Sequence, residues 1–241
     1  MKLLNRVAVI TGAGKGIGKA TAELFLKEGA QLVLSSRNRS DLEDIVSENS
    51  IHKDRIHIIG GNIADEKTIK DITGYTIDRF GKIDILVNNA GFGVFDLMAD
   101  SHTEDFDSMF ATNLRAVYLL TKSFLPHMIR ENQGTIINIS SIAGKKGIAN
   151  ASIYCATKHA LQGLSEALME EVRKYNIRVV VICPGSVDTN FFNPLSKVSL
   201  TASRESVLQS ADIAEACLFA ASLPQRATVS EIIIRPTNPR K

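Results

Sequence analysis

A tyrosine and a lysine four residues apart, Tyr154 and Lys158, lie thirteen and seventeen residues after Ser141. Four residues are about one helical turn, so both side chains project from the same face of a helix. A free phenol has a pKa near ~10 and is a poor acid or base at neutral pH. A neighbouring ammonium favours the phenolate, so we expect Lys158 to lower the pKa of Tyr154. The trio predicts proton exchange with an alcohol or ketone whose oxygen the serine holds. Taken alone, however, most Tyr-x-x-x-Lys pairs are ordinary helix surface.

A glycine-rich turn lies near the start of the chain, between an apolar strand and an amphipathic helix. Small residues allow the backbone to turn tightly, and the following helix presents free N–H groups to a phosphate. With a strand before it and a helix after it, the turn predicts a dinucleotide site rather than a tight turn without a ligand. The residues predicted to hold the cofactor here are Gly12, Gly14, Lys15, Gly16, Ile17 and Gly18.

The second strand ends in Ser36 and Arg37, and no acidic residue occurs between Glu28 and Asp41. A sheet that binds NAD usually places an acid here to accept hydrogen bonds from the ribose hydroxyls. A guanidinium and the nearby Lys15 suit a ribose 2′-phosphate instead. We therefore expect NADP(H) in preference to NAD(H); the alternative is two solvated surface cations.

Short apolar runs alternate with amphipathic stretches along the chain, which predicts a parallel α/β sheet with helices on both faces. No linker or internal repeat divides it, so we expect a single domain over residues 1–241. The predicted strands are residues 6–11, 31–35, 56–59, 83–87, 135–139, 178–182 and 231–234. The predicted helices are residues 15–28, 40–48, 65–80, 103–130, 152–174 and 212–222. Residues 193–209 break this rhythm and are either a substrate-covering loop or a plain surface excursion.

Composition excludes several classes of protein. A net charge of +2 without cationic clusters argues against a nucleic-acid partner. No apolar run reaches the ~18 residues of a membrane span, and no signal-peptide cleavage pattern is found, so we expect a cytoplasmic protein. The cysteines are odd in number, and Cys155, Cys183 and Cys217 have no paired spacing, which indicates small buried side chains. The histidine spacing predicts no metal site.

Six motifs occur in order: Thr-Gly-x-x-x-Gly-x-Gly, Asn88-Asn89-Ala90-Gly91, Asn113, Ser141, Tyr154-x-x-x-Lys158 and Pro184-Gly185. With these motifs the sequence resembles the short-chain dehydrogenase/reductase family over nearly its whole length, including members like the NADP(H)-dependent 3-oxoacyl-[acyl-carrier-protein] reductases. The resemblance implies a Rossmann-type, doubly wound, seven-stranded parallel sheet. It also implies that Tyr154 is the catalytic acid/base, that Lys158 holds the nicotinamide ribose, that Ser141 orients the substrate oxygen, and that Asn113 anchors a proton-relay water.

The resemblance assigns further cofactor contacts. Asn88 is expected to line the adenine ribose and Asn89 to be a plain turn residue. The positions implied to contact the cofactor are Asn62, Ile63, Asn88, Ala90, Gly91, Tyr154, Lys158, Pro184, Gly185, Val187 and Thr189. Asn62-Ile63 replaces the family's usual Asp-Val pair. The end of the chain lacks the Asp-Gly-Gly tail of many acyl-carrier reductases, which argues against a role in fatty-acid synthesis.

These observations predict hydride transfer between NADP(H) and a carbonyl or secondary alcohol, most simply the reduction of a 3-oxoacyl thioester or a small hydrophobic ketone. The alternatives are a non-enzymatic nucleotide sensor and a structural scaffold. The residues expected to line the substrate pocket are Gly93, Val94, Ala143, Ala149, Ile153, Phe191 and Phe192. In relatives the helices equivalent to 103–130 and 152–174 pair into dimers or tetramers, although their apolar positions, such as Val117, Leu120, Leu164 and Leu168, fit a core equally well.

Overall fold

Seven parallel strands form one sheet in the order β3-β2-β1-β4-β5-β6-β7. The protein is seen in a computed structural model that describes residues 1–189, 191 and 207–238. The strands are β1 (Val7–Thr11), β2 (Gln31–Ser36), β3 (Ile56–Gly60), β4 (Ile85–Asn88), β5 (Gly134–Ile139), β6 (Ile177–Pro184) and β7 (Glu231–Ile234). This confirms the parallel sheet that the alternating apolar runs predict and the doubly wound, Rossmann-type architecture that the resemblance implies.

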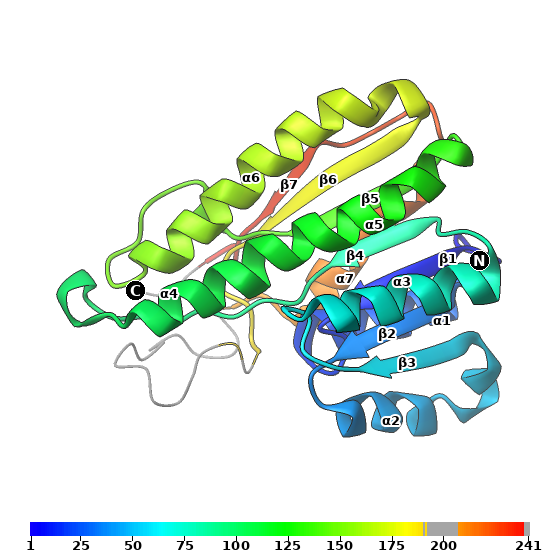
Figure 1. Cartoon of the computed structure of the whole chain (residues 1–241), viewed down its shortest axis with the longest axis horizontal. Helices are drawn as coiled ribbons and strands as arrows, with labels where there is room; N and C mark the ends of the chain where they lie inside the picture. Colours follow the sequence, from blue (N-terminus) through cyan, green and yellow to red (C-terminus); the bar gives the residue numbers. More distant parts are fainter. Residues whose placement is uncertain (190, 192–206, 239–241) are drawn as a thin grey trace.

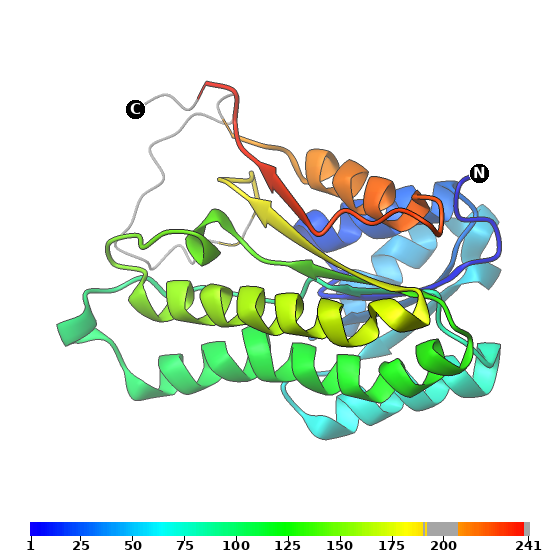
Figure 2. The same ribbon diagram turned by 90° about the horizontal axis from the view of Figure 1, so that it is seen from above.

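Helices cover both faces of the sheet (Figures 1 and 2). They are α1 (Gly16–Lys27), α2 (Arg39–Glu48), α3 (Glu66–Phe80), α4 (Thr103–Phe110), α5 (Ala116–Arg130), α6 (Ser152–Val172) and α7 (Ser210–Ser222). Short 3-10 turns occur at Ser50–Arg55, Met98–Asp100, Ile142–Gly144 and Arg173–Tyr175. One apolar core joins α1, α2 and α7 to the sheet, and a second joins α3, α5 and α6 to its other face. No helix among the described residues is both long enough and apolar enough to cross a bilayer.

All seven predicted strands and six predicted helical segments are found in the predicted order. The main difference lies in residues 103–130, where a five-residue π-helical turn, Ala111–Arg115, separates α4 from α5. Of the apolar positions on the long helices, Val117 and Leu120 belong to the core, with 5% and 1% of their surface exposed. Residues 192–206, which include Phe192 and most of the predicted loop, lie outside the described part of the chain.

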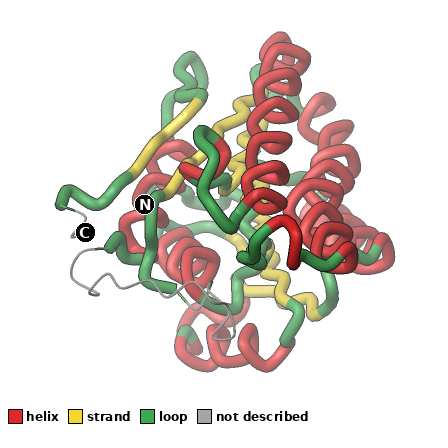
Figure 3. The backbone as a smooth tube through the Cα atoms, turned by 90° about the vertical axis from the view of Figure 1, so that its left-hand side faces the viewer, coloured by secondary structure: helices red, strands yellow, loops and turns green. Residues whose placement is uncertain are grey.

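Strand order decides where a ligand can bind. The chain runs outward from β1 to β3 on one side and then from β4 to β7 on the other, so the direction of winding reverses between β1 and β4. In open parallel sheets the crevice at such a reversal, beyond the carboxyl ends of the strands, is the usual ligand site. Strand arrows in Figure 1 point toward this edge, and Figure 3 views the molecule from it. The glycine-rich turn leaves β1 at this point.

At the amino ends of the strands, opposite the cavity, Asp84 lies just before β4 and links β4 to β1. Its carboxylate accepts hydrogen bonds from Arg6 Nη1 at 2.7 Å and from the Val7 N–H at 2.9 Å, and Lys82 Nζ lies 2.8 Å away. Burial alone would raise the pKa of Asp84, but the hydrogen bonds from Lys82, Val7 and Arg6 outweigh it and lower the pKa. The ionised side chain thus joins the starts of β1 and β4.

We expect Asp84→Asn to lower the free energy of unfolding by about 2 kcal/mol, since two charged partners lose a buried counter-ion. The folded pKa lies below the reference value of 3.8, so the contribution of the carboxylate is present above about pH 4 and is lost as the pH falls further. Urea unfolding from pH 7 to pH 3 measures this: the gap between the two proteins should narrow at the acidic end. Asp78→Asn, an exposed aspartate on α3, is the matched control. An equal change in both variants, or a gap independent of pH, would contradict the assignment.

Candidate active site

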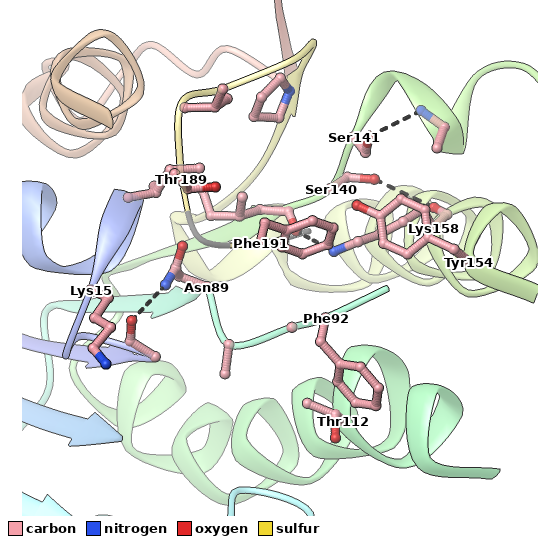
Figure 4. A pocket seen from close by; sticks show the side chains of 18 of the residues that line it. Lys15, Asn89, Phe92, Thr112, Ser140, Ser141, Tyr154, Lys158, Thr189 and Phe191 are labelled. Carbon is pink, nitrogen blue, oxygen red and sulfur yellow. Dashed lines mark hydrogen bonds between the residues drawn. The ribbon is translucent and has the colours of Figure 1, made fainter. Parts of the chain in front are cut away.

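A cavity of about 640 Å³ opens at the carboxyl ends of the strands and spans the winding reversal. Figure 4 shows Lys15 and Asn89 at one side of it and Ser141, Tyr154 and Lys158 at the other. The volume lies within the range of about 300–1,000 Å³ that is typical of ligand pockets. Most of the predicted cofactor and catalytic residues line this one cavity, although they come from segments between Gly12 and Thr189.

The glycine-rich turn brings its backbone very close to neighbouring segments. Gly12 has φ +63°, and an added Cβ would lie 2.9 Å from Ala90 Cα. At Gly18 an added Cβ would lie only 2.2 Å from the carbonyl oxygen of Gly12. Gly12, Lys15 and Ile17 line the cavity, whereas Gly14, Gly16 and Gly18 are not among its lining residues. Lys15 caps α1 without a side-chain hydrogen bond, so the first N–H groups of the helix remain available to an anion.

The two asparagines at the end of β4 point in different directions. Asn89 lines the cavity, and its Nδ2 donates to the carbonyl oxygens of Thr11 at 2.9 Å and Gly12 at 3.1 Å. Asn88 is 2% exposed and is not a lining residue. Its Nδ2 donates instead to Asn138 Oδ1 on β5 at 2.8 Å. Side chains alternate across a strand, so the last residue of β4 faces the interior and the next faces the turn. The predicted contact of Asn88 with the adenine ribose stays a prediction.

One end of the cavity is cationic. Ser36 and Arg37 close β2 there, next to Lys15, and Asn62 and Ile63 line the adjoining wall. Within the described part of the chain, Arg37 has no ion-pair partner, whereas Lys15 Nζ lies 3.3 Å from Asp41 Oδ1. The sequence predicted the two cations and missed Asp41 and Asn38, which also line this end. Asn38 and Asp41 lie at the start of α2 and line the cavity, and no sequence motif indicates this placement.

The other end holds the predicted catalytic residues. Tyr154 and Lys158 lie on α6, are 7% and 4% exposed, and both face the cavity, as their four-residue spacing predicts. Lys158 Nζ donates to the Ile139 carbonyl oxygen at 2.9 Å and lies 5.7 Å from the centre of the Tyr154 ring. Ser141 begins the turn after β5, and its hydroxyl makes a hydrogen bond with the Tyr154 phenol. Helix α6 and the turn after β5 therefore bring the three predicted catalytic side chains together.

The pKa of the tyrosine departs from the expectation. Burial raises the pKa of Tyr154, and the hydrogen bond from Ser141 offsets this only in part. Burial also lowers the pKa of Lys158, to about 8. The expected lowering of the phenol pKa by the ammonium was wrong for this structure, because removal from water dominates for both groups and Lys158 Nζ is directed to a carbonyl oxygen. At neutral pH both groups are protonated.

Asn113 lies in the π-helical turn, is 1% exposed and is not a lining residue. Its Oδ1 accepts from the Phe92 N–H at 3.0 Å, and its Nδ2 donates to the Phe92 carbonyl oxygen at 2.8 Å and to Thr157 Oγ1 at 3.2 Å. These bonds use both amide donors, so the side chain fixes the segment after Gly91 against α6. The predicted role of Asn113 in holding a water stays a prediction.

The segment after β6 completes the wall between the two ends. Pro184, Gly185, Val187 and Thr189 line the cavity as predicted. Ala90 and Gly91 line the wall supplied by the turn after β4, and Gly91 leaves space beside Lys158: an added Cβ there would lie 3.6 Å from Lys158 Nζ. The cofactor contacts expected of these residues stay predictions.

The surface around Tyr154 is apolar and aromatic. Its ring centre lies 5.6 Å from those of Phe95 and Phe191. Of the predicted pocket residues, Ala143, Ala149 and Phe191 line the cavity, whereas Val94 and Ile153 line a separate small pocket. Gly93 lines neither, and the Phe95 ring covers it: an added Cβ would lie 2.8 Å from Phe95 Cζ. The sequence missed several lining residues, namely Phe92, Phe95, Thr112, Ser140, Ile142 and Ile148. Phe92 follows Gly91 directly and Phe95 lies three residues further on, and this proximity was the signal that could have revealed them.

Comparison with known proteins agrees with this arrangement. A sepiapterin reductase of Chlorobaculum tepidum is 36% identical over 242 residues, which cover 98% of each chain. The crystal structure of a metagenomic short-chain oxidoreductase in complex with NADP matches with a TM-score of 0.86 and 32% identity, covering 99% of this chain and 100% of that one. A 3-ketoacyl-(acyl-carrier-protein) reductase of Brucella melitensis complexed with NADH gives a TM-score of 0.86 and 29% identity, covering 96% and 97%. The family model described as short chain dehydrogenase matches residues 6–199, and the chain therefore belongs to this family of oxidoreductases, which act on alcohol and carbonyl groups.

Proposed function

We propose that the protein transfers hydride between NADP(H) and a carbonyl or secondary alcohol, and that it works as a ketone reductase. One observation carries this proposal. A single cavity connects two cationic side chains at its adenosine end, Lys15 and Arg37, with the buried pair Tyr154 and Lys158 at its other end. An elongated dinucleotide with a charged phosphate at one end and a reactive ring at the other fits this distribution of groups.

The lining residues suit each part of that cofactor. The uncapped start of α1 offers N–H groups to the pyrophosphate, and the guanidinium of Arg37 suits a 2′-phosphate. Ala90 and Gly91 leave space beside the catalytic pair, where the nicotinamide would lie. When bound, NADPH supplies the hydride. The complex of a 32% identical relative with NADP supports the same choice of cofactor.

Proton transfer is assigned to the chain itself. The hydroxyls of Ser141 and Tyr154 are hydrogen-bonded to each other and together would hold the carbonyl oxygen. Burial raises the pKa of Tyr154, so the phenol is protonated at neutral pH and ready to donate as negative charge grows on that oxygen. Lys158 restores the proton through its ammonium. The protonated phenol is the form that donates a proton during reduction of the ketone.

The substrate is proposed to be a small hydrophobic ketone or a 3-oxoacyl thioester. Among the described residues, no charged side chain other than Lys158 lies at this end of the cavity, which is formed by Phe92, Phe95, Ser141, Ile142, Ala143, Ile148, Ala149, Tyr154 and Phe191. The names of the two reductase relatives fit carbonyl reduction. A nucleotide sensor is the second candidate, but binding a nucleotide alone does not require the hydroxyls of Ser141 and Tyr154 to lie together in the cavity.

We further propose that the protein forms a homo-oligomer through α4 and α5. Phe106 and Tyr118 are 43% and 45% exposed on these helices, and Leu97 and Met98, next to α4, are 61% and 64% exposed. Exposed aromatic and methionine side chains are enriched at subunit interfaces.

The cofactor assignment is tested at Arg37. We expect Arg37→Asp to raise the dissociation constant of NADPH about tenfold or more, because a charge-assisted contact with the phosphate becomes a repulsion. The dissociation constant of NADH should change less than about threefold, because NADH has no phosphate at that ribose. Quenching of intrinsic tyrosine fluorescence or calorimetric titration measures both constants.

The matched control is Arg39→Asp, which makes the same charge reversal two residues away, at an exposed side chain outside the cavity that pairs with Glu43. It should leave the ratio of the two constants unchanged. Tighter binding of NADH than NADPH by the wild type, or an unchanged preference in Arg37→Asp, would refute the proposed cofactor.

A further inference from the structure

Among the described residues, Asp41 on α2 is the one acidic side chain at the cationic end of the cavity. Its Oδ1 lies 3.3 Å from Lys15 Nζ, and only 19% of its side chain is exposed. Asp41 Cβ also lies close to the glycine-rich turn: a Cβ added at Gly14 would be 2.8 Å from it and 2.9 Å from Ser36 Oγ. Asp41 therefore lies between the turn after β1 and the end of β2, within the cavity wall.

The charges at this end partly cancel. Lys15 and Arg37 each contribute one positive charge, and Asp41 removes one. A ribose 2′-phosphate carries up to two negative charges at neutral pH. It would have to compete with Asp41 for Lys15 and would meet the carboxylate as a like charge, which is unfavourable. A ribose with free hydroxyls carries no charge for Asp41 to repel, and the carboxylate can accept a hydrogen bond from one of its hydroxyls.

We propose that Asp41 is a selectivity residue: it weakens binding of the 2′-phosphorylated cofactor relative to NAD(H), so that the preference for NADP(H) is smaller than the two cations alone would give. The inference rests on the proposed function only in placing the adenosine ribose at the Lys15–Arg37 end. Asp41 acts from the first turn of α2, outside the position at the end of β2 where an acid that selects NAD is expected. The cations proposed to bind the 2′-phosphate, Lys15 and Arg37, therefore lie outside α2, whereas the acid proposed to weaken that binding, Asp41, lies on α2.

A purely structural role makes a different prediction. Asp41 lies near the amino end of α2, where a negative charge stabilises the helix, and Asn38 Nδ2 lies 3.4 Å from its Oδ2. If Asp41 served only the helix, its loss would lower the melting temperature and weaken both cofactors equally. A purely structural role would therefore leave the ratio of the NADPH and NADH dissociation constants unchanged.

The test is Asp41→Asn in the full-length protein, with dissociation constants for NADPH and NADH measured by titration at about 20 mM and 300 mM salt. We expect the NADPH constant to fall roughly three- to tenfold at low salt, with NADH unchanged or up to about threefold weaker, and a smaller shift at high salt because the ions screen the charge. Asp44→Asn is the control, since it removes the same charge from an exposed position on the same helix, outside the cavity.

Equal changes for both cofactors, no change, or the same shift in Asp44→Asn would overturn the inference and leave Asp41 a helix-stabilising residue. The melting temperature of each variant shows whether it is folded. Failure of the proposed function is seen separately, in the wild type: tighter binding of NADH there contradicts the cofactor assignment. Even in that case, the effect of Asp41→Asn is measured as the change in the ratio of the NADPH and NADH dissociation constants relative to the wild-type ratio.

Discussion

Tyr154→Phe will reduce turnover of the best ketone in a substrate panel by about 10²–10⁴-fold, while the dissociation constant of NADPH stays within about threefold of the wild type. The substitution removes only the phenol oxygen, which is the proposed proton donor, and keeps the ring that packs between Phe95 and Phe191. Loss of NADPH absorbance at saturating ketone measures turnover, and cofactor titration measures binding. The buried hydroxyl has Ser141 as its partner, so a small change in melting temperature is expected.

Tyr118→Phe is the control for this experiment, because Tyr118 is 45% exposed on α5, outside the cavity. It should retain nearly full turnover. Substantial turnover in Tyr154→Phe would show that the phenol is not the proton donor, and Ser141 would then be the next candidate. A folded Tyr154→Phe variant that no longer binds NADPH would contradict the separation between cofactor binding and proton transfer on which the proposal depends.

Lys158→Met will abolish most turnover and, at the same time, make the cofactor-free protein more stable. The lysine is buried, and its pKa is about 8 instead of the reference 10.5. Each pKa unit is about 1.4 kcal/mol, so keeping this ammonium charged in the folded state costs roughly 3 kcal/mol near pH 7. Methionine removes that cost but leaves the Ile139 carbonyl oxygen without its donor, which costs about 1–2 kcal/mol.

The expected net gain is about 1–2 kcal/mol, or a rise in melting temperature of about 2–8 °C for a chain of this size. The sign of the pH dependence follows from the two pKa values. Below about pH 8 the lysine is charged in both states and the full gain is present. Between pH 8 and 10.5 only the unfolded state stays protonated, so wild-type stability recovers and the gap closes. Thermal unfolding from pH 6.5 to 10 measures this.

Lys70→Met provides the comparison, since Lys70 is an exposed lysine on α3. It should change the melting temperature little at any pH. A Lys158→Met variant that is less stable than the wild type at pH 7 would show that the ammonium is well solvated or well paired in the folded protein. Turnover near the wild-type value would exclude Lys158 from the reaction.

Local patterns determined much of the protein. The apolar runs predicted the seven strands in order because a strand buried on both faces is mostly apolar, as β1, β4, β5 and β6 are apart from a few buried polar residues such as Asn138 and Arg178. The spacing of Tyr154 and Lys158 placed both on one face of α6 because a helical turn has a fixed number of residues. The glycine-rich turn was visible because a close backbone approach at Gly12 and Gly18 leaves no space for a side chain.

Other features depended on contacts between segments that are distant in the sequence. Asn88 and Asn89 are adjacent, and only the point at which β4 ends decides which of them faces the cavity and which bonds to Asn138. Similarly, the predicted long helix contains a π-helical turn, where the amide of Asn113 bonds to the main chain of Phe92. Hydrophobic periodicity carries no information about a one-residue insertion of this kind.

The sequence by itself predicted the order of strands and helices and placed Tyr154 and Lys158 on one helix face, because helical and strand periods act over a few residues, and its motifs carry the resemblance to the family. The tertiary structure alone decided the charge states and the balance of charge at the two ends of the cavity. Tyr154 and Lys158 have shifted pKa values because of how deeply they are buried, and burial is set by the whole fold. Asp41 opposes Lys15 only because α2 packs beside the glycine-rich turn, and the strength of an electrostatic interaction depends on distance and solvent in three dimensions.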